Sequence, residues 1–129
     1  MNEEALDLWR RAQTALSTAG VLVERDPDAA ASRAYYAAFY AVSAYLALTG
    51  SSFRKHTAVE RAVHRDLVRP GLWPQELGTT FSWLVSLRYT GDYGGVHHVP
   101  PGEATEAVEG ARAILNAVQA AASEAFQSP

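Results

Sequence analysis

Residues 29–50, AAASRAYYAAFYAVSAYLALTG, are apolar on nearly every side when they are wound into a helix. A helix that is apolar all round belongs in the interior of a globular protein. The stretch therefore predicts a central, buried helix over about residues 29–49, with Gly50 as its C-terminal stop. Arg33 is the one charged residue inside this helix.

The two sides of this helix differ in the size of their side chains. Large residues gather on one side, at Tyr36, Phe39, Tyr40, Val42 and Leu46. Small residues gather on the other, at Ala34, Ala37, Ala38, Ala41 and Ala44. Alanines let a neighbouring helix approach closely, and that helix can belong to this chain or to a second copy. Because one small bundle is not expected to cover both sides fully, we predict a symmetric homodimer.

Helical periodicity continues on both sides of the central helix. An N-terminal apolar stripe repeats at intervals of three and four residues, at Ala5, Trp9, Ala12, Leu16, Ala19 and Val23. Patterns of this kind predict helices over about residues 3–24, 29–49, 57–68, 74–90 and 103–125. Asp28, after Pro27, is expected to cap the second helix. We therefore predict an all-α fold, an up-and-down bundle of about five helices in a single domain over residues 1–129.

Composition and charge exclude several classes of protein. A net charge of −3 over 129 residues argues against the broad basic surface of a duplex-binding protein, although a local basic patch remains compatible with it. The absence of cysteine excludes disulfides, thiolate zinc sites and cysteine nucleophiles. No apolar run approaches the ~20 residues that cross a bilayer, and we expect a soluble cytoplasmic protein. The sequence has no phosphate-binding glycine loop or metal-ligand spacing, so it predicts neither a cofactor nor a metal site.

Arg88 is the unusual residue of the fourth predicted helix. It follows Leu77, Phe81 and Leu84 at helical spacing, so it lies on the face that points into the core. A guanidinium in that position must be paired or must open into a cleft. Asp92, four residues on, offers an ion pair at the helix end. The alternative is an anion site, because arginine binds phosphate through two parallel hydrogen bonds.

Arg33 raises the same question in the central helix, where it could pair with Asp92 or with the acidic end of another helix. Tyr93 follows Arg88 closely and could stack on a base, although packing is the commoner role of a tyrosine.

Histidines supply the other candidate chemistry. His97 and His98 are neighbours in a loop rich in glycine and proline, where exposure to solvent or general-base catalysis are both open. Adjacent histidines seldom chelate one metal ion. A cap or a local hydrogen bond accounts for His56, which lies just before the third predicted helix.

Three stretches together resemble the HEPN domain family, in its short stand-alone prokaryotic form. They are SRAYYAAFYAVSAYLALTG (32–50), FRKHTAVERAVHRDLVRPG (53–71) and LVSLRYTGDYGG (84–95). The resemblance covers about residues 4–122 and rests on R-A-Y-Y-A-x-F, K-H and R-x-x-x-D-Y in this order. It implies a helical bundle that usually dimerises. It also implies either a metal-independent endoribonuclease or the partner of a small nucleotidyltransferase, often as toxin and antitoxin.

The resemblance assigns Arg88 to the arginine that holds the scissile phosphate in the ribonuclease members. Their signature places a histidine after four to six intervening residues, but this chain has Tyr93 and Gly95 there, and His97 follows only after eight. A tyrosine, with a pKa near 10, is a poor general base at neutral pH.

We therefore expect a nucleotide- or RNA-binding module whose site includes Arg88, Asp92, Tyr93 and Arg33. The alternative is an active endoribonuclease at a dimer cleft, with Arg88 and His97 as its catalytic residues. The third possibility is a purely structural oligomer.

Overall fold

The computed structural model of the chain describes residues 2–52 and 55–127. Met1, Phe53, Arg54, Ser128 and Pro129 lie outside the described residues, and with them small parts of the expected 1–129 domain and of the 53–71 stretch. The helices are α1 (Glu3–Leu22), α2 (Pro27–Leu48), α3 (His56–Ala62), α4 (Gln75–Tyr93) and α5 (Pro101–Ala121). A π-helical turn, Val63–Val68, continues α3 directly. The predicted all-α bundle of about five helices is confirmed.

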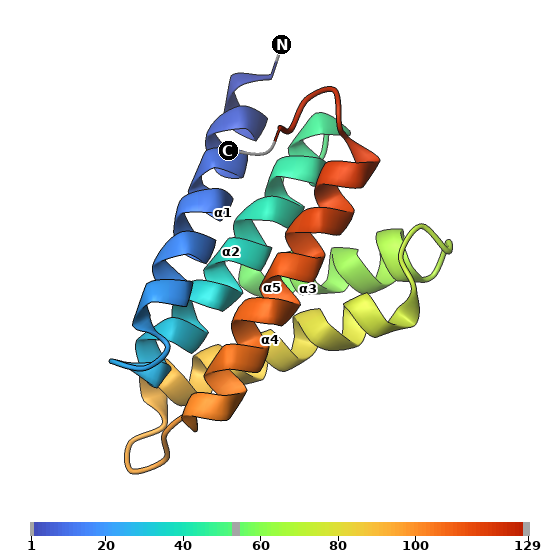
Figure 1. Cartoon of the computed structure of the whole chain (residues 1–129). Helices are drawn as coiled ribbons and strands as arrows, with labels where there is room; N and C mark the ends of the chain where they lie inside the picture. The colour runs from blue at the N-terminus through green and yellow to red at the C-terminus, as the bar shows by residue number, and fades with distance from the viewer. Residues whose placement is uncertain (1, 53–54, 128–129) are drawn as a thin grey trace.

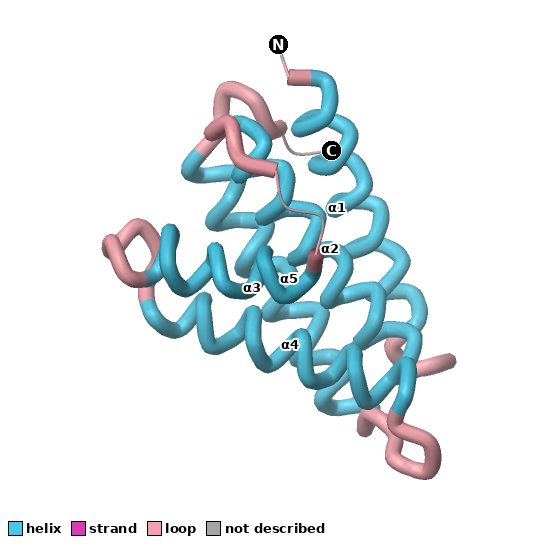
Figure 2. The backbone as a smooth tube through the Cα atoms, turned by 180° about the vertical axis from the view of Figure 1, so that it is seen from behind, coloured by secondary structure: helices cyan, strands magenta, loops and turns pink. Residues whose placement is uncertain are grey.

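Three long helices, α1, α2 and α5, lie side by side (Figure 1). Helices α2 and α5 run in the same direction, and α1 runs against both. The α3–α4 pair crosses them at an angle and projects to one side, as the view from behind also shows (Figure 2). No helix within the described residues is both long enough and apolar enough to cross a membrane.

Helix α2 is the central helix that the sequence predicts, because α1, α4 and α5 all pack against it. Its small residues are completely buried within one chain, at Ala34, Ala37, Ala38, Ala41 and Ala44. Helices of the same chain therefore cover the alanine side, which is one of the two possibilities that the sequence left open. On the aromatic side Tyr36 and Tyr40 stay half-buried. The structural argument for a homodimer rests on that side.

The ends of α2 and α4 differ from the prediction in ways that matter for the site. Asp26, not Asp28, caps α2, since the Asp26 carboxylate accepts a hydrogen bond from the Ala29 amide at 3.1 Å. Pro27 takes the first helical position, where its missing N–H costs nothing. Helix α4 continues to Tyr93 rather than residue 90. As a result Asp92 lies within α4, and the Asp28 carboxylate, which does not cap α2, can form other hydrogen bonds.

Helix α4 crosses α2 very closely at Gly91. A Cβ atom at this position would lie 2.6 Å from the backbone oxygen of Asp28, so only glycine fits without movement of the backbone. The close approach brings the preceding turn of α4, with Arg88, against the aromatic side of α2. Gly91 thereby sets how deep Arg88 sits.

Candidate functional site

Arg88 is packed against tyrosine side chains from two helices, α2 and α4. Its Nη2 donates a hydrogen bond to the Tyr36 hydroxyl at 3.0 Å, and only 21% of its side chain is exposed. The guanidinium carbon is 5.5 Å from the ring centroids of both Tyr36 and Tyr93, and 5.8 Å from that of Tyr35. Aromatic ring faces attract a cation at such distances. Arg88 is therefore held firmly by groups that do not neutralise its charge.

Asp92 supplies the counter-charge. Its Oδ2 lies 3.0 Å from Arg88 Nε, one helical turn along α4, so the ion pair expected from the i, i+4 spacing forms. The N–H of Nε is not directed at the carboxylate, and this buried nitrogen has no hydrogen-bond partner among the described residues. An arginine carries five N–H donors. Most of that donor capacity is unused in Arg88, so the ion pair and an anion site are compatible.

His56 belongs to the same cluster, although the sequence predicts only a local role for it. Its Nδ1 lies 2.6 Å from the Tyr35 hydroxyl, and its ring stacks on Phe39 at 4.4 Å between centroids. Burial, and then the nearby positive charge of Arg88, lower the pKa of His56. The imidazole is therefore neutral at pH 7. Residues 56 and 88 are too far apart in sequence for any spacing rule to join them.

Arg33, about one turn before Tyr36 on α2, also contacts the Tyr36 ring. Its guanidinium carbon lies 4.7 Å from the Tyr36 ring centroid. Neither of the two pairings that the sequence allowed, with Asp92 or with the acidic end of another helix, forms for Arg33 among the described residues, and Asp92 pairs with Arg88. Among the described residues Arg33 forms no ion pair. Tyr36 thus connects two arginines.

Tyr93 has an exposed fraction of 63%, and Tyr89 beside it has 64%; their rings are 5.4 Å apart. The Tyr93 ring contacts Arg88 on one side and remains open to solvent. This arrangement leaves an aromatic face accessible at the edge of the Arg88 cluster, where a base could stack.

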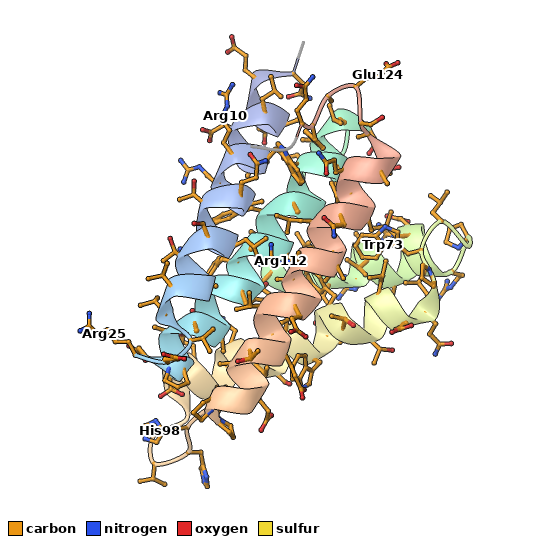
Figure 3. The ribbon with its side chains drawn as sticks, viewed as in Figure 1. Arg10, Arg25, Trp73, His98, Arg112 and Glu124 are labelled. Atoms are coloured by element: carbon orange, nitrogen blue, oxygen red, sulfur yellow. The ribbon has the colours of Figure 1, made fainter. Side chains whose placement is uncertain are left out.

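The two loop histidines lie at a different place, beyond the N-terminal end of α2. His98 Nδ1 is 2.6 Å from Asp28 Oδ2, and Asp28 Oδ1 accepts a hydrogen bond from the Val99 amide at 2.7 Å. Figure 3 shows His98 in the loop that joins α4 to α5. Asp28 and Tyr36 are two turns, roughly 12 Å, apart along α2. His97 is exposed in this loop, and the contacts of Arg88 described above do not include it, so its catalytic role remains a prediction.

The candidate site therefore consists of Arg88, Asp92, Tyr36, His56 and Tyr93. Within residues 2–52 and 55–127, no three histidine or carboxylate side chains gather as a metal site requires. The chemistry available is that of a fixed cation, a neutral imidazole, hydroxyl groups and aromatic faces.

Comparisons with known proteins identify the family of the chain. The HEPN domain profile matches residues 5–121. A UPF0332 protein of Thermotoga maritima is 34% identical over 119 residues, which cover 91% of this chain and 90% of that protein. A UPF0332 protein of Gloeobacter violaceus is 33% identical over 98 residues, which cover 75% of this chain and 78% of that protein. The chain belongs to the HEPN domain family and is, in general terms, a nucleotide- or RNA-related module.

Proposed function

We propose that this protein is a binding module whose Arg88 site takes a phosphate group of a nucleotide or of RNA. The observation that supports this most directly is Arg88 itself. The side chain is four-fifths buried and its guanidinium donates one hydrogen bond to the Tyr36 hydroxyl, which leaves most of its terminal N–H groups without an acceptor among the described residues. A charged hydrogen bond to phosphate is stronger than a neutral one, and a pre-positioned arginine loses little entropy on forming it.

The neighbours of Arg88 suit the rest of a nucleotide. Tyr93 exposes an aromatic face on which a base can stack. Asp92 stays on the Nε side of the guanidinium and keeps its orientation, so a phosphate would approach the terminal Nη atoms. The neutral His56 adds a donor or an acceptor without repelling the cation.

The alternative, an endoribonuclease, is supported by His56 rather than by the loop histidines. A neutral imidazole beside a phosphate-binding arginine is a competent general base at pH 7. In that reaction the ribose 2′-oxygen attacks phosphorus and His56 takes the 2′-hydroxyl proton. The bond to the 5′-oxygen breaks, water supplies a proton to that oxygen, and a 2′,3′-cyclic phosphate remains. Arg88 would stabilise the charge of the pentavalent phosphate.

A homodimer and a nucleotidyltransferase partner are also proposed, on the basis of family membership and the half-exposed aromatic side of α2. The dimer would place two Arg88 sites across one cleft. Light scattering should give twice the chain mass of 13.9 kDa. A measured mass of one chain would contradict the dimer. Tagged protein isolated from its native host should retain a nucleotidyltransferase if the partnership exists.

The decisive experiment measures RNA binding and metal-free RNA cleavage by wild type, Arg88→Ala and Arg88→Lys. The matched control is Arg65→Ala, which removes an arginine from an exposed ion pair with Asp66 on the α3 side. Circular dichroism first establishes that each variant is folded. We expect Arg88→Ala to weaken binding by roughly tenfold or more, as the removal of a charged hydrogen bond predicts, while Arg65→Ala binds normally.

Three outcomes separate the functions. Binding that depends on Arg88, without cleavage, supports the module. Cleavage that is abolished in both Arg88→Ala and His56→Gln supports the ribonuclease. Binding that is absent, or equal in folded wild type and Arg88→Ala, contradicts both and leaves Arg88 a structural residue.

A further inference from the structure

We infer that the groove between α1 and α5 binds an amphipathic α-helix of another protein, and that this helix presents a carboxylate to Arg112. Among the described residues, none of the candidate site lines this groove. The inference therefore does not depend on the proposed function, and it adds a second surface to the molecule.

The groove exists because α1 and α5 both pack along α2 but contact each other less extensively (Figure 1). Two hollows, of about 390 Å³ and 490 Å³, lie between α1 and α5. Gly20 and Arg112 line both of them, so the hollows join into one groove. Along α1 the groove extends from Trp9 to Val23, roughly 21 Å at the rise of an α-helix.

The C-terminal segment of the chain closes the groove at the end near the N-terminus of α1. The fully buried Phe126 ring stacks on Trp9, with 4.9 Å between the ring centroids. Trp9 Nε1 and Gln13 Nε2 donate hydrogen bonds to the Gln127 carbonyl oxygen at 3.1 and 2.9 Å. The groove is open from Gln13 to Val23, which is roughly 15 Å or three helical turns.

The lining of the open part suits a helix with a narrow apolar stripe. Its floor is apolar, and its walls carry polar side chains; the floor residues are Leu16, Val108 and Leu115, and the wall residues are Ser17, Thr105 and Asn116. The backbone groups of α1 and α5 are paired within their own helices, so an extended peptide would find no strand edge here. A helix satisfies its own backbone and binds such a groove through side chains at helical spacing. It would complete a four-helix arrangement with α1, α2 and α5.

Gly20 is a glycine that the fold itself does not require. A glycine inside a helix lowers stability relative to alanine. The φ angle of Gly20 is not positive, and a Cβ atom there would meet no heavy atom of the described residues within 4 Å. Because Gly20 lines both hollows, its missing side chain leaves room for a second backbone to approach α1.

Arg112 supplies the charge that selects the partner. Figure 3 shows it between α1 and α5, in front of α2. Within the described part of the chain Arg112 forms no ion pair, and neither Glu24 nor Glu109 of the second hollow pairs with it. Charge complementarity fixes the register of an interface. The docked helix should therefore carry an aspartate or glutamate opposite Arg112 and a lysine or arginine opposite the two glutamates.

The test is site-specific photo-cross-linking of the whole chain in its native host. Benzoylphenylalanine replaces Asn116, an exposed residue of the groove wall, and mass spectrometry identifies the segment that is cross-linked. The matched control carries the same amino acid in place of Arg65, which is exposed and lies outside the groove. Each protein is also made with Arg112→Glu, and with Arg69→Glu as a charge control at an exposed position.

We expect cross-linking from position 116 to a segment of another protein with apolar residues every three or four positions and an acidic residue among them. Arg112→Glu should lower the yield roughly tenfold or more, because like charges would then face each other across the interface. Arg69→Glu should leave the yield unchanged. Replacing the acidic residue of the partner segment by arginine should restore cross-linking to the Arg112→Glu chain.

Gly20→Leu tests the same groove without a change of charge. The new side chain has room in the free chain and favours a helix, so the melting temperature should not fall. The same side chain fills the groove, so the cross-linking yield from position 116 should decrease. A lower melting temperature, or an unchanged yield, would contradict a docked helix.

Four results of the cross-linking experiment would overturn the inference. Equal yields from positions 116 and 65 would show non-specific contact. Cross-links only to a second copy of this chain would make the groove an interface between copies. A yield that Arg112→Glu leaves unchanged would remove the carboxylate from the partner. The absence of any cross-link from position 116 would show that the groove has no protein partner.

Discussion

Two histidines in this protein form hydrogen bonds of the same length through the same atom, yet they lie in opposite environments. His56 Nδ1 is 2.6 Å from the Tyr35 hydroxyl, and His98 Nδ1 is 2.6 Å from Asp28 Oδ2. The His56 ring is half-buried against Phe39, while the His98 side chain is 69% exposed. The difference between the two regions shows that burial and charge, not bond length, decide what a histidine can do.

In the His56 region both bonded groups are neutral at pH 7. Burial raises the pKa of Tyr35, and burial with the charge of Arg88 lowers that of His56. In the His98 region the partner is a carboxylate. Its pKa is lowered by the hydrogen bond from the Val99 amide and then by His98. In the His56 region, side chains of the candidate site pack together. In the His98 region, hydrogen bonds to Asp28 join an exposed loop to the start of α2.

The largest expected difference between the regions is in packing. Phe39→Ala removes a ring that contacts His56, Tyr35 and Tyr36, and it leaves a cavity in the aromatic cluster. We expect the free energy of unfolding to fall by about 3–5 kcal/mol. Urea denaturation followed by circular dichroism measures this. Tyr89→Ala, at an exposed ring, is the control, and an equally large decrease there would contradict the assignment of the core.

A smaller effect should follow from Tyr35→Phe, which removes only the hydroxyl. The substitution leaves Nδ1 of the half-buried His56 without its partner, and such a change costs about 1–2 kcal/mol in unfolding free energy. Tyr89→Phe is the matched control and should be neutral. If Tyr35→Phe is as stable as wild type, the hydrogen bond does not hold His56 in place.

The pH dependence of stability should also separate the regions. The pKa of His56 is lowered in the fold, so the unfolded chain binds the proton more readily, and stability is lost as pH falls below the usual histidine value of 6.5. The pKa of Asp28 is likewise lowered, but its contribution is lost only below its usual value of 3.8.

Urea denaturation between pH 8 and pH 5 tests the first window, with His56→Gln compared directly with wild type. The wild-type protein should lose stability relative to the variant as the pH falls. Parallel curves for the two proteins would show that His56 does not titrate differently in the folded and unfolded states.

The smallest effect is expected for His98→Ala. An exposed histidine–carboxylate contact contributes at most about 1 kcal/mol, and Asp28 keeps its hydrogen bond to the Val99 amide. Thermal denaturation should therefore move by only a few degrees. A destabilisation as large as that of Phe39→Ala would contradict this prediction. It would show that the His98 loop contributes as much to stability as the aromatic cluster does.

The sequence alone determined the features that depend on neighbours within a helix. Apolar periodicity was enough for the all-α fold and for the central position of α2, because burial of one face repeats every three to four residues. The same spacing was enough to predict the Arg88–Asp92 pair, which forms within a single turn. These features depend on the helices themselves and not on how the helices pack against one another.

Only the tertiary structure decided which residues from different helices meet. The contacts of His56 with Tyr35, Arg88 with Tyr36 and His98 with Asp28 join residues 21, 52 and 70 positions apart. The Arg88–Tyr36 contact depends on where α4 crosses α2, and the two backbones approach closely at Gly91 in that crossing. Helical periodicity predicts which face of a helix is buried, but it does not predict which residues of other helices contact that face. For that reason His56 was assigned a local role, Asp28 was taken for a cap, and the sequence left open whether a helix of this chain or of a second copy covers the alanine side of α2.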